Sequence, residues 1–422
     1  MEEPALHRRL GLAGAGVTNM LVMIGVGPFL TIPLLLSAMR GPQAMWGWVL
    51  GAVISIADGL VWAELGAALP HAGGGYRYLL EAYGPRGPGR LASFLYLWAM
   101  VVGGPMLFAS GALGFSQYAA YLWPAMTPWL GKAMAAAVCL ACTALIWRRI
   151  DRIGRLGLIL AAAVLAACLW MILEGLLHGH VAGAAPASAA RAGAPVVWAG
   201  LGAATLYALY DYGGYATVCQ VGGEVKRPER TIPAAILIAI GAVAALYVAM
   251  SLSVVTAMPW REAARSSFIG SDFIARFQGR RAGEAMTVLV LISAFASVFG
   301  GMLGLSRIPF AAARDGRFFR AFARLHPTGE FPTFAVAYVG LASAAGCLLD
   351  LEQAIKATMV ILALVANIPA VFAPTLLRRR GARLPFRMWL YPLPSLIALA
   401  GWTYIVGANG WSYLAVAGAA LA

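Results

Sequence analysis

The chain has 422 residues, of which 61% are hydrophobic and only 11% are charged, and its formal net charge at pH 7 is +14. A soluble domain normally has about twice that charged fraction, so the composition excludes an ordinary soluble protein. The basic charge does not indicate nucleic-acid binding, because Lys and Arg are scattered over short connections and form no continuous face. The apolar runs instead approach the ~20 residues that cross a bilayer.

Eleven apolar runs predict membrane-spanning helices, and a twelfth is cut short by the C-terminus. The expected spans are 13–38, 43–68, 89–121, 130–147, 155–178, 195–220, 231–258, 283–307, 333–349, 352–377 and 386–406, with the short one at 408–422. Most of the 31 Lys and Arg lie in alternate connections, which predicts a cytoplasmic N-terminus. No cleavage pattern follows the first run, so we expect the N-terminus to be retained.

Two of the runs are interrupted by glycine where a membrane helix should be most regular. The interruptions are Ile24-Gly25-Val26-Gly27-Pro28 and Tyr210-Asp211-Tyr212-Gly213-Gly214. Proline has no N–H to donate, and glycine lowers the cost of unwinding a helix. Broken helices at corresponding places in two halves of a chain are typical of the substrate site of a secondary transporter. The ten residues named are therefore candidate substrate-binding residues.

Each break offers a different chemistry. The first exposes N–H groups at the positive end of a half-helix, which favours a carboxylate, although a packing kink is the alternative. In the second, Asp211 costs roughly 2.5–3.5 kcal/mol near the bilayer centre. Its carboxylate can bind a substrate ammonium, hold or relay a proton, or cap the amides of Gly213 and Gly214. Tyr210 and Tyr212 close over a substrate or pack as ordinary aromatics. An anion site opposite a cation site suits an α-amino acid, provided that the breaks meet.

The layout of the spans predicts an internal repeat. Five spans separate the two breaks, and an odd number means that the halves insert in opposite orientations. We therefore expect a single transmembrane domain over 1–422, with one inverted repeat at 13–178, a second at 195–377 and additional helices at 386–422.

Several other features of the sequence also have plain structural interpretations. We expect a short amphipathic helix at 318–325 on the membrane surface, and a lid or a plain surface helix within 266–277. Asn367 and Gly104 interrupt helices, either as kinks or as cavity-lining residues. Glu64 and Glu174 are expected to reach the interface. The C-x-x-C pair Cys139 and Cys142 lies in one apolar helix, so neither metal nor cofactor is expected.

At this point a resemblance to a known family becomes specific. Residues 210–233, YDYGGYATVCQVGGEVKRPERTIP, resemble the sixth helix and following loop of the amino acid–polyamine–organocation transporters. IGVGPF resembles the G-x-G-I-F break of that superfamily, AELGAALPHAGGGYRYLLEAYG its second helix and first loop, and SRIPFAAARDGRFF the loop after its eighth helix. The resemblance covers nearly the whole chain and is closest to bacterial relatives of the L-type amino acid transporters.

The resemblance implies an all-α integral membrane protein with a LeuT-like fold. That fold is a 5+5 inverted repeat with discontinuous helices 1 and 6, here followed by helix 11 and a truncated helix 12. By position, Gly25, Val26 and Gly27 would contact the substrate carboxylate, Tyr210 would be an aromatic gate, and Asp211 and Gly213 would lie near the ammonium.

The chain departs from the family pattern at several positions. Val26 and Pro28 replace a usual Ser and Ile, and Tyr215 replaces a usual Trp. Ala161 stands where many sodium-independent members have a lysine, which leaves room for a sodium site that uses Ser293 or Ser297. For both serines, a bond to the helix backbone is the alternative.

The expected function is secondary active transport of amino acids by alternating access, as a permease or an antiporter. Na+ and H+ remain open as coupling ions, and so does simple exchange. The expected partners are a small-molecule substrate and the lipid bilayer, and the oligomeric state is left open. Only three lysines against 28 arginines suggest a GC-rich bacterial genome, so the expected location is the cytoplasmic (inner) membrane of a bacterium. One alternative is a transporter of polyamines or other organic amines. Another is a membrane-embedded enzyme, but the expected spans of this chain hold no paired catalytic groups.

Overall fold

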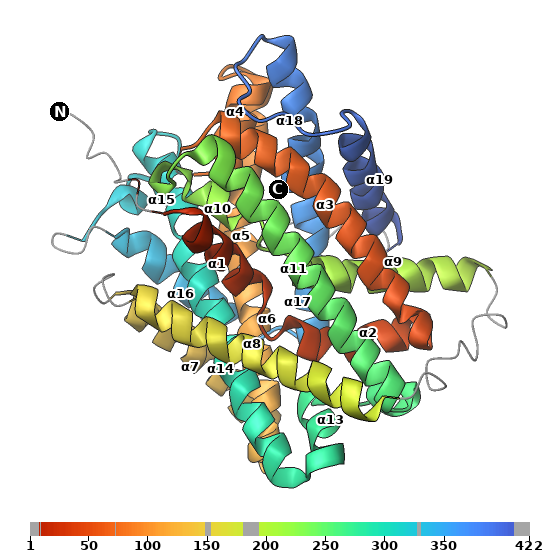
Figure 1. Ribbon diagram of the computed structural model, residues 1–422. Helices are drawn as coiled ribbons and strands as arrows, with labels where there is room; N and C mark the ends of the chain where they lie inside the picture. Colours follow the sequence, from red (N-terminus) through yellow and green to blue (C-terminus); the bar gives the residue numbers. More distant parts are fainter. Residues whose placement is uncertain are drawn as a thin grey trace.

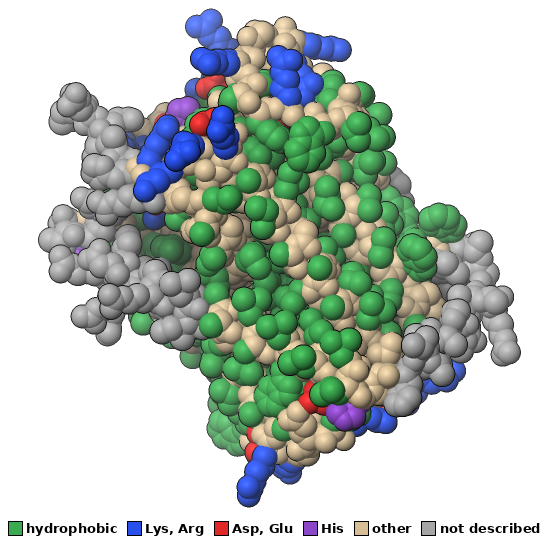
Figure 2. All heavy atoms as spheres, viewed as in Figure 1, with side chains coloured by type: hydrophobic (Ala, Val, Ile, Leu, Met, Phe, Trp, Pro, Cys, Tyr) green, Lys and Arg blue, Asp and Glu red, His purple; other side chains and the backbone are tan. Residues whose placement is uncertain are grey.

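The computed structural model describes residues 8, 10–71, 73–147, 153–179, 194–326 and 331–408. Most of the helices run between two ends of the molecule (Figure 1). Helices α4 (Gly75–Tyr83) and α15 (Arg307–Arg314) lie toward one end, and α13 (Ile269–Gln278) lies at the other. In Figure 2, charged side chains gather at these two ends, whereas the surface between them is largely hydrophobic. This distribution is that of a multi-pass membrane protein.

Among the described residues, seven helices are long and apolar enough to cross a membrane, or eight if one bent pair counts as a single span. They are formed by α3 (Met45–Ala68), α5 (Pro88–Val102) with α6 (Gly104–Leu122), α7 (Pro128–Ile146), most of α8 (Ile153–His178), α11 (Pro228–Ala257), α14 (Arg280–Leu305) with α15, and the end of α17 (Leu351–Leu362) with α18 (Ile368–Arg379). Helices α9 (Ala194–Tyr212), α16 (Thr333–Gly346) and α19 (Leu393–Ala408) correspond to the remaining expected spans. The all-helical membrane fold is thereby confirmed, while the expected stub at 408–422 lies almost wholly outside the described residues.

Both predicted helix breaks are present. Helix α1 (Leu12–Met23) and helix α2 (Gly27–Met39) are bent by 49° at the break between them. Pro28 is the second residue of α2, where its missing N–H disrupts no helical hydrogen bond. Helix α9 ends at Tyr212, and the chain passes through Gly214 with φ +113° before the short α10 (Thr217–Gln220) begins. Only glycine adopts that backbone region without strain.

Two further interruptions occur where the sequence suggested them. Helix α5 ends at Val102 and α6 starts at Gly104. Helix α17 passes into α18 through a π-helical turn, Ala363–Asn367, and such turns are frequent at functional sites.

Two sequence expectations about element positions are wrong. The amphipathic helix is α15, whereas the expected segment 318–325 contains only a 3₁₀ turn, Arg320–Ala323. The reason is that Gly316, at φ +68°, ends α15, and Phe322 then packs into a small aromatic cluster. The last expected span starts at Leu393 rather than at 386, because residues before it form a loop and the helix begins next to proline.

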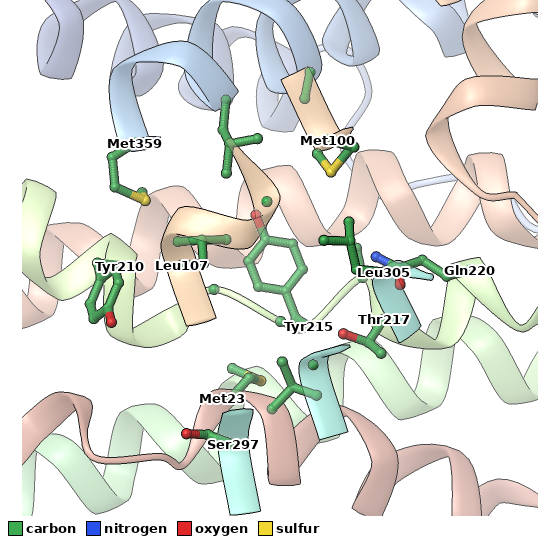
Figure 3. A pocket seen from close by; sticks show the side chains of 18 of the residues that line it. Met23, Met100, Leu107, Tyr210, Tyr215, Thr217, Gln220, Ser297, Leu305 and Met359 are labelled. Atoms are coloured by element: carbon green, nitrogen blue, oxygen red, sulfur yellow. The ribbon is translucent and has the colours of Figure 1, made fainter. Parts of the chain in front are cut away.

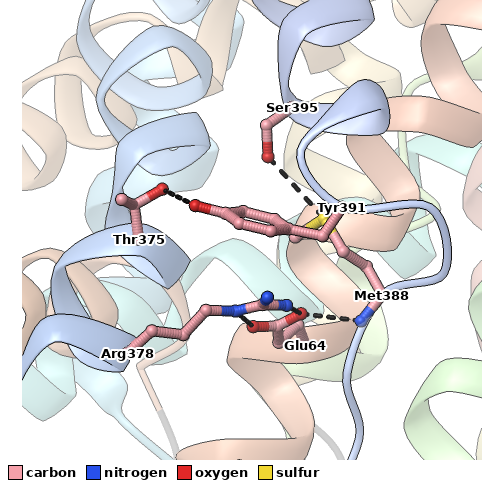
Figure 4. A network of polar contacts seen from close by, with 6 residues as sticks. All are labelled: Glu64, Thr375, Arg378, Met388, Tyr391 and Ser395. Atoms are coloured by element: carbon pink, nitrogen blue, oxygen red, sulfur yellow. Dashed lines mark hydrogen bonds and ion pairs between the residues drawn. The ribbon is translucent and has the colours of Figure 1, made fainter. Parts of the chain in front are cut away.

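Glu64 was expected to reach the interface, but its side chain is completely buried. Its carboxylate accepts hydrogen bonds from Nε and Nη2 of Arg378, at 2.9 and 2.7 Å, and from the N–H of Met388 at 2.7 Å (Figure 4). The guanidinium of Arg378 also lies 3.8 Å from the ring centre of Tyr391. This network joins α3 and α18 to the loop before α19. Glu174 is likewise buried, and its carboxylate accepts a hydrogen bond from Gln278 at the end of α13.

Candidate functional site

The two helix breaks lie directly against each other. A Cβ atom built on Gly27 would be 2.1 Å from Oδ1 of Asp211, and one built on Gly214 would be 2.8 Å from Cγ1 of Val22. These approaches are possible only because both positions are glycine. The interpretation as an amino acid site required that the two breaks meet, and they do.

A cavity of about 240 Å³ lies at this meeting point. Its walls come from both breaks and from α3, α5, α6, α10, α14, α17, the π-helical turn and α19. Seven of the ten candidate residues line it: Gly25, Val26, Gly27, Tyr210, Asp211, Gly213 and Gly214. The other three, Ile24, Pro28 and Tyr212, are not among the described residues that line it.

Asp211 is the only acidic or basic side chain among the described residues that line the cavity. It is 2% exposed, and its Oδ2 accepts a hydrogen bond from the hydroxyl of Thr31 in α2. Its Oδ1 is buried without a hydrogen-bond partner. The carboxylate therefore binds α2 and does not cap the amides of Gly213 or Gly214 through Oδ1. A buried carboxylate oxygen with no donor is costly, which favours a ligand that supplies one.

The first break provides fewer free amides than the sequence suggested. The N–H of Gly25 donates to the carbonyl of Met23 at 3.1 Å, and Pro28 has none. The N–H of Gly27 starts α2 and has no acceptor within the helix. This positive helix end lies beside Asp211, so the anion-favouring and cation-favouring groups are neighbours and do not stand at opposite ends of the cavity.

The two tyrosines of the second break have different roles. Tyr210 lines the cavity, and its hydroxyl lies 2.7 Å from Oγ of Ser110 in α6 (Figure 3). Tyr212 is fully buried behind the cavity, where its hydroxyl donates to the carbonyl of Trp48 at 3.2 Å. Tyr212 is therefore an ordinary packing residue in this structure.

The two serines proposed for an ion site also differ. Ser297 lines the cavity next to the first break, since a Cβ built on Gly25 would be 2.6 Å from its Oγ. Ser293 is buried in α14 outside the lining. Each hydroxyl donates to a carbonyl of its own helix, so an ion could use only their lone pairs. No group of three metal-ligating His, Cys, Asp or Glu side chains occurs in the described part of the chain.

Sequence reasoning missed most of the large side chains around the cavity. They are aromatic and methionine residues on several helices: Trp62, Tyr96, Met100, Phe108, Met359 and Trp402. An isolated aromatic or methionine in an apolar helix carries no signal of the direction in which it points. Asn367 and Gly104 do line the cavity, as the interruptions of their helices suggested, and so does Tyr215.

Comparisons with known proteins agree with this architecture. The model of the amino acid permease family matches residues 11–417. An uncharacterized transporter of Mycobacterium tuberculosis is 32% identical over 349 residues, which cover 81% of this chain and 73% of that protein. The serine/threonine exchanger SteT of Bacillus subtilis is 26% identical over 423 residues, 97% of this chain and 92% of SteT.

A human relative, the large neutral amino acids transporter small subunit 2, is 30% identical over 333 residues, 76% of this chain and 61% of that protein. These relatives are transporters, and the resemblance to the amino acid–polyamine–organocation transporters is confirmed. Because the family model covers nearly the whole sequence, the chain belongs to the amino acid permease family.

Proposed function

We propose that the chain is a secondary transporter that carries α-amino acids across a bacterial inner membrane by alternating access. The substrate site would be the cavity at the two helix breaks. The observation that carries the proposal is the contact between the breaks, in which the unpaired Oδ1 of Asp211 lies beside the N-terminal end of α2.

The neighbouring charges of the site favour an α-amino acid. Such a molecule has its ammonium and its carboxylate on one carbon atom, so it needs a cation-binding and an anion-binding group side by side. Asp211 supplies the first, and the N–H of Gly27 with the positive end of α2 supplies the second. A polyamine has several separated ammonium groups, whereas Asp211 is the only acidic residue among the described residues that line the cavity.

Hydrogen bonds join α2 to α6 and α13 toward one end of the molecule. Phe29 of α2 is fully buried, the hydroxyl of Tyr118 donates to its carbonyl at 2.9 Å, and the N–H of Gly270 in α13 donates to that hydroxyl at 3.2 Å. Toward the other end, residues of α4 and α5 such as Gly75 and Tyr96 line the cavity. With a cytoplasmic N-terminus this would be an inward-facing state, and alternating access would separate α2 from α13.

The conformational change would follow from a LeuT-like arrangement, with 13–178 and 195–377 as the inverted repeats. The breaks at the first and sixth spans support it, because they are the discontinuous helices that such a fold requires. Names of relatives supply two trial substrates: a serine/threonine exchanger suggests L-threonine, and a large neutral amino acid transporter suggests L-leucine.

The proposal is tested by counterflow in liposomes that contain the purified protein. Vesicles preloaded with one unlabelled compound are diluted into the same compound with a radiolabel, and the panel holds the twenty L-amino acids, putrescine and spermidine. We expect accumulation of at least one L-amino acid and none of its methyl ester, which lacks the carboxylate charge. Accumulation of polyamines alone would overturn the proposal and make Asp211 an amine site.

A further inference from the structure

A second buried carboxylate lies immediately behind the cavity wall. Asp58 of α3 is completely buried. The hydroxyl of Tyr215 donates to its Oδ2 at 2.5 Å, and the indole N–H of Trp402 donates to its Oδ1 at 3.0 Å. Both donors line the cavity, and Figure 3 shows the ring of Tyr215 in the middle of it. One side chain therefore separates Asp58 from the cavity.

Among the described residues, Asp58 has no cationic partner. The side chains that face it or its neighbours are Tyr215 after α9, Trp402 of α19, Trp62 one turn further along α3, Ile236 and Ile240 of α11 beside Gly59, and Arg378 of α18, which is paired with Glu64. None of the ion pairs among the described residues includes Asp58. A membrane-buried carboxylate without a cation is costly in its charged form, so binding of a proton there is favoured.

We propose that Asp58 is the proton-binding site that couples transport to the proton gradient, and that Tyr215 passes the proton between it and the cavity. The proposal rests on the transport function proposed above. When Asp58 is ionised, the Tyr215 hydroxyl donates to Oδ2. A proton arriving from cavity water binds the Tyr215 oxygen, and the original hydroxyl hydrogen passes to Oδ2. Tyr215 again has one O–H and now accepts from the carboxyl group, so one H+ has moved from the cavity to Asp58.

The chemistry of the two donors separates their roles. A tyrosine hydroxyl both donates and accepts, so it can reverse its hydrogen bond, whereas an indole N–H only donates. Trp402 can therefore hold Oδ1 in both states but cannot carry the proton. The hydroxyl of Tyr215 is therefore the group that makes the relay chemically possible. The reversal also turns the Tyr215 hydrogen toward the cavity, next to the second break.

Two variants separate proton movement from the transport of the amino acid. Asp58→Asn keeps an acceptor for Trp402 and a polar partner for Tyr215, and it mimics the protonated state. Tyr215→Trp keeps an aromatic donor at the cavity wall but cannot relay. The wild-type protein and both variants are reconstituted in liposomes that contain the pH indicator pyranine, with L-threonine and L-leucine as probes. Proton entry and labelled amino acid entry are recorded in the same vesicles.

We expect wild-type vesicles to acidify as amino acid enters. Asp58→Asn is expected to keep counterflow while proton entry falls to the level of protein-free vesicles. Tyr215→Trp is expected to move fewer protons per amino acid than wild type. Unchanged proton entry with Asp58→Asn would overturn the proposal, and so would wild-type uptake that needs sodium and moves no protons.

A second measurement keeps the test independent of the substrate. Infrared difference spectra of the purified protein between acidic and alkaline pH report the C=O stretch of protonated carboxylic acids. We expect part of this band to disappear in Asp58→Asn and to remain in Asp211→Asn. If the wild type exchanges none of the twenty L-amino acids, the proposed function fails, whereas this spectrum still shows whether Asp58 binds a proton. A band that is unchanged in Asp58→Asn would show that Asp58 takes up no proton.

Discussion

Gly27 and Asp211 constrain each other across the two breaks. Oδ1 of Asp211 occupies the space that a Cβ atom on residue 27 would need, and Oδ2 is held by Thr31 one turn further along α2. The carboxylate can therefore lie at the start of α2 only if residue 27 has no side chain. Substitution at either position changes the site without removing the cavity.

Gly27→Ala is expected to abolish counterflow, because the new Cβ would overlap the carboxylate at 2.1 Å and force it away from Thr31. Overpacking of this kind costs about 1–3 kcal/mol of folding stability. The matched control is Gly16→Ala in α1, where a Cβ meets nothing within 4 Å. Thermal melting and counterflow of both variants are compared with wild type. Full activity of Gly27→Ala would mean that the contact plays no part in transport.

Asp211→Asn tests the charge alone, since asparagine keeps the size of the side chain and an acceptor for Thr31. Loss of a hydrogen bond to a charged group is worth about 1.5–3 kcal/mol, so we expect binding of the amino acid to weaken about 10–100-fold. Binding is measured by titrated thermal shift. Thr31→Val serves as control, because it removes the bond between the helices but keeps the charge. Equal affinity of Asp211→Asn and wild type at all pH values would rule out an ammonium site.

The sequence predicted the part of the candidate site that is formed by the backbone of the two breaks. Glycine and proline in an apolar run indicated the breaks, and seven of the ten named residues line the cavity. The helix period could also have separated Tyr210 from Tyr212, because residues two apart point to nearly opposite faces of a helix. Trp402 and Asp58 could not be placed, since their roles depend on how α3 and α19 pack.

At the scale of elements, α13 is held to the helices by its apolar face, and it carries one half-buried acid. Ile269, Phe273 and Ile274 are buried, and the hydroxyl of Ser266 donates to Oδ2 of Asp272 at 2.5 Å. Burial raises the pKa of Asp272 above its ordinary value, with a smaller opposing effect from Ser266. Because the folded-state pKa is the higher one, the stability that Asp272 contributes is present at low pH. It is lost as pH rises through that folded pKa.

Asp272→Asn is accordingly expected to raise the melting temperature at neutral pH, since asparagine makes the same hydrogen bond and cannot ionise. The gain should vanish as pH falls below the ordinary value of 3.8, where Asp272 is protonated in both states. Asp350→Asn, at an exposed carboxylate near Lys132, is the control and should change little. The measurement is the melting temperature of the wild type and both variants as a function of pH. A lower melting temperature of Asp272→Asn at neutral pH would contradict this account.

The Glu64–Arg378 pair fixes the packing of α3, α18 and the loop before α19. Glu64→Gln leaves the guanidinium without its anion and weakens three hydrogen bonds. We expect a loss of about 2–4 kcal/mol in stability, as when one partner of a buried pair is removed. Glu284→Gln, which breaks an exposed pair with Arg280, should cost within about 0.5 kcal/mol. Similar melting temperatures for the two variants would show that the buried pair does not hold these elements together.

The sequence predicted the existence of these elements better than their ends. Apolar runs of sufficient length located the eleven full spans, because a bilayer requires them, while the twelfth at 408–422 stays a prediction. The helix expected at 318–325 was wrong for a tertiary reason: its phenylalanines pack on one another in a loop. The buried state of Glu64 was equally invisible, since its partner lies 314 residues away in the chain.

For the whole molecule, the orientation in the membrane decides which conformational state the structure represents. The cavity is lined by residues near α4, whereas near α13 the helices α2, α6 and α13 are joined by hydrogen bonds. Arginine-rich connections at the α4 end predict that this end is cytoplasmic. The α13 end would then face outward, and the structure would correspond to the state that exchanges substrate with the cell interior.

Cysteine labelling tests this orientation, because all five native cysteines are buried and should give little background. Arg86→Cys lies after α4 and Arg281→Cys lies after α13, and both positions are exposed. In intact cells, we expect a membrane-impermeant maleimide to label Arg281→Cys alone, whereas after lysis both variants should react. The opposite pattern would place the N-terminus outside. Asp58 would then take its proton from the external solution in this conformation, and the same relay would describe loading of the transporter instead of release.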